Sequence, residues 1–403
     1  MSAPKWSAEA LAASPNPLAA HYARFRVTER LLLTGHSHQA WPDVGFEGQV
    51  EAWEDAARLV DDKWERAGEK ADRVRRGFAQ LLGDRDGAIA LGQNTHELVI
   101  RFLSALPLAK RPRLVTTDGE FHTLRRQMDR LAEEPWVEIV KVAAEPADTL
   151  AERLAREVTD RTAAVFVSSV LFASARIVPG LGDLLAVCRA RGAELLVDAY
   201  HHLNVVPFSL ATERLEDAFV VGGGYKYCQL GEGNCFLRVP PGREAMRPIA
   251  TGWFGEFERL ADAAPGEVPY GTGAARWAGA TYDPTSHYRA ARVLDFFEAQ
   301  ALEPALLRAV SRHQVGVLAR QFDALDLDPQ VIARDHDVSL DTVAGFLALR
   351  TPRAAAVTAA LRRHDVVVDS RADVLRLGPA PYLSDDQLRE AIVRLGEVAT
   401  RRP

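Results

Sequence analysis

Short apolar runs alternate with helix-like segments through the middle of the chain, and this alternation limits the possible folds more than any other feature. The runs are AIAL (88–91), RLVTT (113–117), VEIVKVA (137–143), AAVFVSSV (163–170), ELLVDAY (194–200) and AFVVGGG (218–224). Segments with helical spacing of apolar residues lie between them, such as 148–158 and 181–192. Such alternation indicates βαβ units. We therefore expect an α/β fold with a mainly parallel sheet flanked by helices.

The two ends of the chain follow a different pattern. Helical spacing occurs before the first run and after the last one, over residues 45–67, 71–83 and 286–322. Two more apolar runs follow, at 338–350 and 366–378. The pattern predicts a large domain at 46–287 and a smaller α+β domain at 288–403, with an N-terminal arm at 1–45 that packs on the small domain.

Composition excludes several classes of function. The 403 residues carry a formal net charge of −6 with both signs dispersed, which leaves no broad basic surface for nucleic acid or an anionic membrane. No apolar run approaches the roughly 20 residues of a membrane span. The start lacks the features of a signal peptide, and the three cysteines form no CxxC pair. We expect a soluble cytoplasmic protein. No HExxH motif or other recognised ligand spacing is present, so no metal site is predicted.

In open α/β sheets, ligands bind at the carboxyl ends of the strands. The stretch AIALGQNTHELVIRFLSAL (88–106) reads as a strand, a glycine turn and a helix that Asn94 and Glu97 can cap. The free N–H groups of such a helix start, together with the Asn94 and Thr95 side chains, can hold a phosphate. An ordinary capped helix has the same pattern.

Two more strand ends carry reactive groups. Asp198 ends a hydrophobic strand and is followed by His201 and His202. A carboxylate at that depth must be paired, either with a cationic ligand nitrogen or with the backbone of the next turn. Lys226 lies between two tyrosines just after three glycines. A partly desolvated lysine has a lowered pKa and can form a Schiff base. The alternative is an ordinary solvated lysine on a loop, which has the same sequence pattern.

Arg376 lies in an alternating strand, where an inward-facing arginine would clamp a carboxylate and an outward-facing one would meet solvent. The four signals together specify one kind of ligand. It has a phosphate for the helix start, a ring nitrogen for Asp198, an aldehyde for Lys226 and an amino-acid carboxylate for Arg376. Pyridoxal phosphate with an amino-acid substrate has these four groups.

The motifs resemble those of the class V aminotransferase superfamily of pyridoxal-phosphate enzymes, which have fold type I, and most of all those of kynureninase. Asp198-Ala199-Tyr200-His201 is similar to the D-x-x-H of that family, and Tyr225-Lys226-Tyr227 to its Y-K-Y. Gly252-Trp253-Phe254-Gly255 is similar to its G-W-F-G, and RLGPAPYLS (376–384) to its C-terminal arginine segment. The motifs occur in family order between about residues 35 and 384.

The resemblance implies a role for each matched residue. Lys226 would bind the cofactor covalently and move protons, and Asp198, with His201 beside it, would pair with the pyridine nitrogen. Asn94, Thr95, Tyr225 and Trp253 would reach the phosphate, and Phe121 would stack on the ring, with His122 as the alternative. Arg376 and Ser37 would bind the substrate. The resemblance also implies a homodimer with sites at the subunit interface, in which Thr281 serves the phosphate of the neighbouring subunit.

The implied reaction is hydrolytic cleavage of a Cβ–Cγ bond, with alanine as a product. Kynureninases have an Asn-Tyr-x-Thr/Ser-Gly loop where this chain has LFASA (171–175), and a histidine where it has Glu256. The aryl-binding histidine has no counterpart near Trp64. We expect Leu171, Ala175 and Glu256 to change the wall of the substrate pocket, and hence the substrate.

Other reactions remain open. The same cofactor supports aminotransfer, β-elimination and epimerisation. Cysteine desulfuration is disfavoured because no cysteine follows Cys235. A dinucleotide-binding oxidoreductase is a more distant alternative, since Gly180 and Gly182 lack the third glycine of G-x-G-x-x-G.

Overall fold

The six apolar runs all form strands of one large sheet. The computed structural model describes residues 6–262 and 266–400. Its 7-stranded sheet has the order β2-β8-β7-β6-β5-β3-β4. The strands are β2 (Ala88–Gly92), β3 (Arg113–Thr117), β4 (Glu138–Val142), β5 (Thr162–Ser168), β6 (Glu194–Asp198), β7 (Phe219–Gly223) and β8 (Cys235–Val239). The pairs among β3 to β7 are parallel, which confirms the predicted α/β fold.

Strand β8 was not predicted. It follows the glycine-rich segment that contains Lys226 and lies between β2 and β7, antiparallel to both. Helices connect the other strands: α4 (Thr95–Ala105), α5 (His122–Leu131), α6 (Leu150–Arg156), α7 (Leu181–Ala190) and the short α8 (Leu210–Glu213). Helix α4 buries an apolar stripe, since Val99, Phe102 and Leu103 all lie in the core.

The two long helical stretches, 45–67 and 286–322, are each divided between two helices. Helix α2 (Val44–Leu59) ends at Val60, which has a φ of 51°, and α3 (Lys63–Leu82) begins three residues later, inside the stretch predicted to be continuous. The stretch 286–322 is divided into α9 (Thr285–Ala299) and α10 (Pro304–Asp323), because Pro304 starts a new helix rather than extending the old one. The predicted boundary at residue 288 falls inside α9, which packs on α2 and α3.

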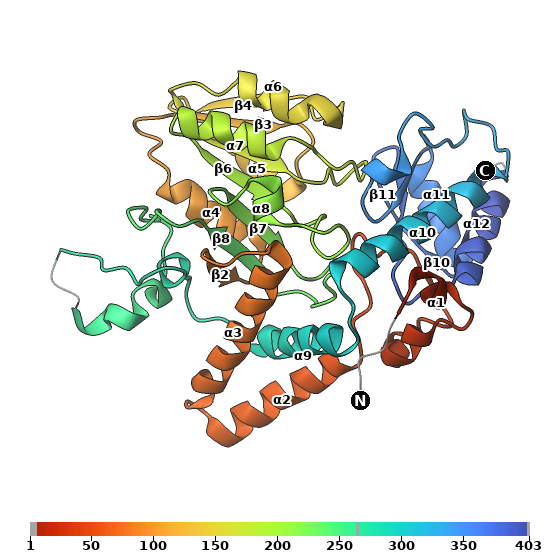
Figure 1. Cartoon of the computed structure of the whole chain (residues 1–403), viewed down its shortest axis with the longest axis horizontal. Helices are drawn as coiled ribbons and strands as arrows, with labels where there is room; N and C mark the ends of the chain where they lie inside the picture. The colour runs from red at the N-terminus through yellow and green to blue at the C-terminus, as the bar shows by residue number, and fades with distance from the viewer. Residues whose placement is uncertain (1–5, 263–265, 401–403) are drawn as a thin grey trace.

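The C-terminal part builds a second, smaller sheet with the order β11-β12-β9, at the right of Figure 1. Its strands are β9 (Leu347–Arg350), β11 (Asp369–Arg371) and β12 (Val374–Leu377), and α11 (Ala354–Arg363) and α12 (Asp385–Thr400) accompany them. Strand β1 (Leu31–Leu32), from the N-terminal segment, pairs in parallel with β10 (Val366–Val367).

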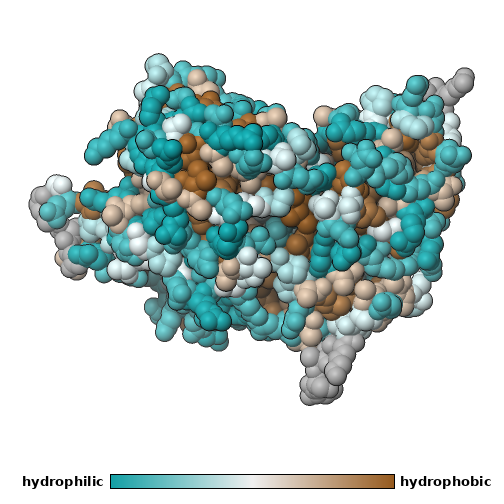
Figure 2. Space-filling view, turned by 45° about the horizontal axis from the view of Figure 1, so that its top comes forward, coloured by the Kyte–Doolittle hydropathy of each residue, from teal (hydrophilic) through white to brown (hydrophobic). Residues whose placement is uncertain are grey.

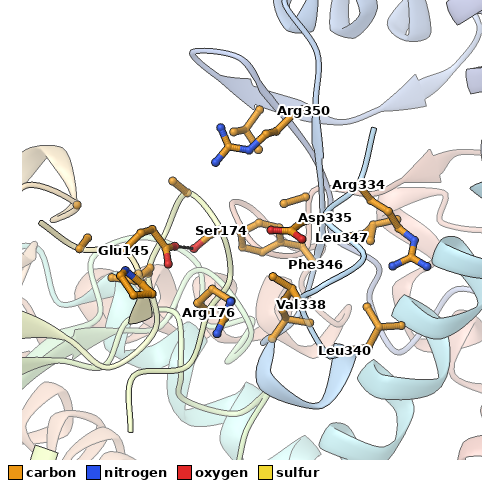
Figure 3. Close-up of a pocket in the computed structure, with 18 of the residues that line it drawn as sticks. Glu145, Ser174, Arg176, Arg334, Asp335, Val338, Leu340, Phe346, Leu347 and Arg350 are labelled. Atoms are coloured by element: carbon orange, nitrogen blue, oxygen red, sulfur yellow. Dashed lines mark hydrogen bonds between the residues drawn. The ribbon is translucent and has the colours of Figure 1, made fainter. Parts of the chain in front are cut away.

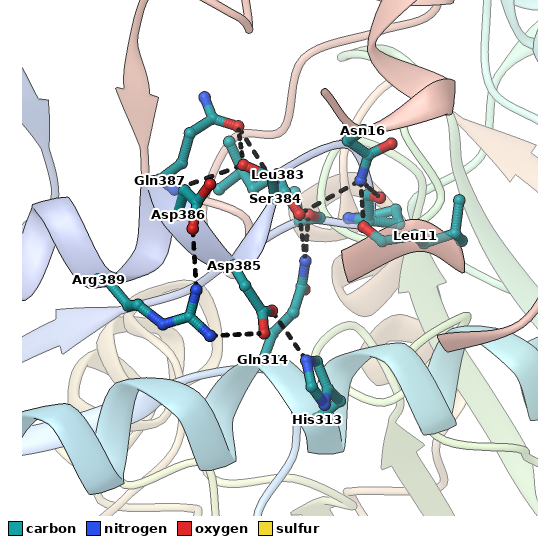
Figure 4. A network of polar contacts seen from close by, with 12 residues as sticks. Leu11, Asn16, His313, Gln314, Leu383, Ser384, Asp385, Asp386, Gln387 and Arg389 are labelled. Atoms are coloured by element: carbon teal, nitrogen blue, oxygen red, sulfur yellow. Dashed lines mark hydrogen bonds and ion pairs between the residues drawn. The ribbon is translucent and has the colours of Figure 1, made fainter. Parts of the chain in front are cut away.

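The N-terminal segment is attached to this smaller unit by hydrogen bonds. It contains α1 (Ala8–Ala12) and a 3-10 helix, Pro17–Phe25. The Asn16 Nδ2 group donates to the carbonyl oxygens of Pro381 (2.9 Å) and Leu383 (3.2 Å). Gln314 of α10 donates to the Leu383 carbonyl from the other side (3.1 Å), as Figure 4 shows. The segment that follows β12 is therefore held between residues from both ends of the chain.

Residues 249–262 and 266–282 form an arm that projects from the large sheet, shown in green at the left of Figure 1. The arm contains three 3-10 turns, Trp253–Gly255, Phe257–Asp262 and Ala275–Trp277. Ile249, Phe257 and Val268 are exposed on it. Within the described ranges, no helix combines the length and the apolar character needed to cross a membrane.

Candidate active site

A cavity of about 240 Å³ opens at the carboxyl ends of β5, β6 and β7, beside the start of α4. It brings together most of the residues that the sequence singled out. Its lining includes Asn94, Thr95, Phe121, Asp198, His201, Tyr225 and Lys226. These residues converge because the carboxyl ends of parallel strands meet at one edge of the sheet.

Lys226 lies inside this cavity with only 4% of its surface exposed. Its Nζ donates to the Tyr225 hydroxyl (2.8 Å) and lies 4.3 Å from the ring centroids of both Tyr200 and Tyr225. Burial lowers the pKa of Lys226 to about 7, although the Asp198 charge acts in the opposite direction. A large fraction of the amine is therefore neutral near pH 7 and can act as a nucleophile.

Asp198 lines the same cavity from the end of β6. Its Oδ1 accepts a hydrogen bond from the Tyr200 N–H (2.8 Å), and no other hydrogen bond to the carboxylate is found among the described residues. Burial raises the pKa of Asp198. His201 is buried next to it, and burial holds the pKa of His201 well below its ordinary value, so the ring is neutral. Its Nδ1 has no partner within the described structure.

The start of α4 forms the opposite end of the cavity. Asn94 Oδ1 accepts from the Glu97 N–H (3.0 Å), and its Nδ2 donates to Glu97 Oε1 (3.0 Å), which confirms the predicted cap. The Asn94 side chain is therefore engaged with the helix. Thr95 remains at the cavity, together with the positive end of the α4 dipole. Such an end is suited to bind a phosphate.

Phe121 lines the cavity, and its ring centroid lies 5.3 Å from Lys226 Nζ. His122 is the first residue of α5 and does not line the cavity. The geometry favours Phe121 over His122 as the stacking residue. Of the LFASA segment, Phe172 lines the cavity and packs edge-on against Phe121 (5.5 Å between centroids). Leu171 and Ala175 are buried and do not line it, so the prediction that they form its wall was wrong.

Several residues of the cavity were missed by the sequence reading. Tyr200 lies within the D-x-x-H segment, and its place directly after a strand was a usable signal. Cys235 lines the cavity as the first residue of β8. It was missed because that strand was not predicted. Ser168 also lines the cavity, and its hydroxyl donates to the buried Glu120 carboxylate (2.6 Å). Burial raises the pKa of Glu120 to about 7.

Arg376 is buried but already has partners. Its Nε and Nη2 donate to the two oxygens of Asp369 (2.9 and 2.5 Å), and its Nη1 donates to the Phe172 carbonyl (2.7 Å). The Nε2 of buried His36 donates to the same Asp369 carboxylate (2.7 Å). Burial alone would raise the pKa of Asp369, but the His36 and Arg376 contacts outweigh it and hold that pKa below the ordinary value. Arg376 is therefore not free to bind a substrate carboxylate with both of these nitrogens, because they already donate to the carboxylate of Asp369.

Four other predicted or noted residues lie outside the cavity of their own chain. The Trp253 indole N–H donates to the Thr281 hydroxyl (3.1 Å) on the projecting arm, and Glu256 follows on the same arm. Ser37 contacts His38 (3.4 Å), whose ring stacks on Tyr225 at 4.8 Å. Trp253 therefore does not reach the site of its own chain, and the roles predicted for Trp253, Thr281 and Ser37 stay predictions.

A family model described as "Kynureninase C-terminal domain" matches residues 319–395. Among curated sequences, an isopenicillin N epimerase from Streptomyces clavuligerus is 27% identical over 187 residues, which cover 45% of this chain and 46% of that protein. An uncharacterised aminotransferase, YcbU of Bacillus subtilis, is 23% identical over 345 residues, covering 85% of this chain and 88% of the other. A kynureninase from Xanthomonas campestris is 26% identical over 196 residues, 45% of each chain. The match thus spans about half the length of the epimerase and of the kynureninase.

Solved structures agree over a greater length. A C-DES structure with glycine linked covalently to its pyridoxal-phosphate cofactor superimposes with a TM-score of 0.80 at 15% identity, over 94% of this chain and 99% of the other. A cysteine desulfurase from Thermococcus onnurineus gives 0.80 at 17% identity, over 99% of each. The chain therefore has the fold of these solved structures, fold type I, and its sequence is similar to an aminotransferase and to kynureninases. The resemblance read from its motifs is confirmed at this level.

The residues that line the cavity fit pyridoxal phosphate, the cofactor in the C-DES structure. The largely neutral Lys226 amine is suited to the aldehyde, and the carboxylate of Asp198 to a protonated ring nitrogen. The start of α4 is suited to the phosphate, and Phe121 to the face of the ring. The described residues contain no group of three or more histidine, cysteine or acidic side chains placed to hold a metal ion.

Proposed function

We propose that the chain is a pyridoxal-phosphate-dependent enzyme that acts on an amino acid. The observation that carries this proposal is the Lys226 amine, which is buried in one cavity with the Asp198 carboxylate and the start of α4. When bound, the cofactor supplies an electron sink for the electrons released at the substrate Cα. Asp198 keeps the ring nitrogen protonated, Lys226 moves protons at the substrate carbons, and Phe121 and Tyr200 exclude water from the amine.

For the reaction itself, we propose hydrolytic Cβ–Cγ cleavage with alanine as a product, on a substrate other than L-kynurenine. The match to the kynureninase C-terminal domain supports the reaction type. The altered substrate is supported by Phe172, the residue of the LFASA segment that lines the cavity. Phe172 has no hydroxyl where the kynureninase loop has a tyrosine. A pocket without polar partners for the groups of a substrate discriminates strongly against it.

The reaction is tested by incubating the holoenzyme with L-kynurenine and with a panel of β-substituted and γ-keto amino acids, and identifying products by mass spectrometry. We expect slow release of anthranilate and faster release of alanine from another member of the panel. Anthranilate release with kcat/KM of about 10⁴ M⁻¹s⁻¹ or more would contradict the altered substrate and make the protein an ordinary kynureninase.

Aminotransfer is the second candidate. It is favoured by the aminotransferase YcbU, whose match covers 85% of this chain, far more than the kynureninase match does. The same panel separates the two reactions when a keto acid is added as amino-group acceptor. Formation of a new amino acid from the keto acid would identify aminotransfer, whereas alanine formed without any acceptor would identify cleavage.

Cofactor loading should depend on pH through Lys226. Because burial lowers the pKa of this amine to about 7, it is mostly protonated below that pH and mostly neutral above it. The rate at which apoprotein takes up pyridoxal phosphate, followed by absorbance, should therefore rise up to about pH 7 and then level off. Asp198→Asn should lower the midpoint, because the Asp198 charge raises the Lys226 pKa. A rate that climbs steadily towards pH 10, as for an ordinary lysine with a pKa of about 10.4, would contradict this assignment.

We also propose a homodimer in which the projecting arm contacts a second copy of the chain. The arm exposes Ile249, Phe257 and Val268, and it carries the Trp253–Thr281 pair outside the cavity of its own chain. Phe257→Glu should therefore shift the protein towards the monomer in sedimentation equilibrium. Val393→Glu is the matched control, since Val393 is equally exposed (51% against 53%) but lies on α12. Equal behaviour of the two variants would remove the arm from the interface.

A further inference from the structure

A second and larger cavity, of about 710 Å³, lies between the large sheet and the smaller C-terminal unit. One side is formed by segments that follow β3, β4 and β5, and the other by residues 334–350 and Val374. Its volume falls within the range of about 300–1,000 Å³ that is typical of small-molecule sites. Figure 2 shows the molecule hollowed between two lobes, with hydrophobic residues in the hollow.

One wall of this cavity carries opposite charges close together. Glu145 and Ser174 are joined by a hydrogen bond from the Ser174 hydroxyl to Glu145 Oε1 (2.9 Å), and Arg176 lies beside them in Figure 3. Glu145 makes no ion pair with any cation in the described part of the chain. Arg176 pairs by one nitrogen with Asp148 (2.8 Å), whose side chain is 65% exposed, and its buried Nε has no partner in that part of the chain. Glu145 Oε2 also accepts from the Ala147 N–H (3.0 Å), so the wall offers a hydrogen-bonded carboxylate without a cation and a guanidinium whose one ion pair is to an exposed aspartate.

The facing wall carries an apolar patch, formed by Val338, Leu340, Phe346 and Leu347, as Figure 3 shows. Asp335 and Arg350 also line this side of the cavity. Arg334 also lines this side, but the two oxygens of Asp323 hold it at 2.6 Å each. The cavity therefore suits a small molecule with an ammonium and a carboxylate at one end and an apolar body at the other.

A loop separates this cavity from the one that contains Lys226. The loop runs from Val170 to Ile177, which bridge each other at its base. Phe172 lines the Lys226 cavity, and its carbonyl accepts from Arg376, whereas Ser174 and Arg176 line the larger cavity. A ligand on the charged wall would contact the same loop that holds Arg376.

We propose that the larger cavity binds a free α-amino acid with an apolar side chain, as a site separate from the one at Lys226. Arg176 takes the carboxylate, Glu145 takes the ammonium, and the side chain packs on Leu340 and Phe346. The ligand is bound there and is not converted. The assignment does not depend on which reaction Lys226 supports.

The test uses N,N-dimethyl-L-phenylalanine, a zwitterion whose tertiary amine cannot form a Schiff base with a cofactor. Its binding to the holoenzyme is measured by isothermal titration calorimetry. We expect one site per chain, and an affinity that is unchanged after the enzyme is saturated with aminooxyacetate, which condenses with the aldehyde of pyridoxal phosphate. Arg176→Met and Glu145→Gln should each weaken binding by about tenfold or more. N,N-dimethylphenethylamine, which lacks the carboxylate and likewise cannot form a Schiff base, should be insensitive to Arg176→Met.

Arg191→Met is the matched control, because Arg191 also pairs with one exposed carboxylate, Asp160 (2.9 Å), but does not line the cavity. It should leave the affinity unchanged. Thermal melting of each variant shows that it is folded. Loss of binding after aminooxyacetate treatment would place the probe at Lys226 and overturn the proposal. Full affinity in both the Arg176 and the Glu145 variants, or no saturable binding to the wild type, would overturn it equally.

Discussion

Lys226→Ala should abolish covalent attachment of pyridoxal phosphate and reduce kcat by at least about 10²–10⁴-fold, the usual contribution of a positioned proton-transfer group. The fold should remain intact, because the Lys226 side chain makes one hydrogen bond, to Tyr225, and its burial disfavours the charged amine. Borohydride reduction followed by peptide mapping measures the attachment, and circular dichroism checks the fold.

Lys110→Ala serves as the control for this experiment, since Lys110 is an exposed lysine that does not line the cavity. It should retain full attachment and activity. A labelled lysine other than Lys226 in the wild-type peptide map would show that the cofactor site has been assigned to the wrong residue.

Arg376→Ala should have two separate effects. It should raise KM by about 10–100-fold for every amino-acid substrate, because the motif resemblance assigns Arg376 to the α-carboxylate that is common to all of them. It should also lower the free energy of unfolding by about 3 kcal/mol, because Asp369 is left as a largely buried carboxylate without its cation. We take the lower end of the usual range, since the Asp369 side chain is 17% exposed and keeps His36. Steady-state kinetics and urea denaturation measure the two effects.

The double variant Asp369→Asn/Arg376→Ala separates substrate binding from structure. Removing both charges should restore most of the lost stability, whereas KM should stay high. Arg376→Lys should recover little of the affinity, because an ammonium cannot reproduce the two-pronged contacts of a guanidinium. A double variant with wild-type KM would show that Arg376 serves only as the structural partner of Asp369.

Much of this fold and site followed from local sequence patterns. The runs that form β5, β6 and β7 became strands because their length and β-branched content fit the buried centre of a parallel sheet. Asn94 caps α4 through Glu97, three residues later, an interaction contained within one helical turn. Asp198 and Lys226 could be placed together because each follows a parallel strand, and such strands end at the same edge of the sheet.

Other features depended on contacts between distant segments, and only the tertiary structure decided them. The register of β11 and β12 places Asp369 opposite Arg376, and His36, 333 residues away from Asp369, completes the cluster. The turn into β8 brings Cys235 to the cavity, and the Val170–Ile177 loop directs Phe172 to one cavity and Arg176 to another. Residue spacing determines which face of an element is apolar, but it carries no information on which distant side chain will meet that face. The partner of a buried charge is set by packing across the whole chain.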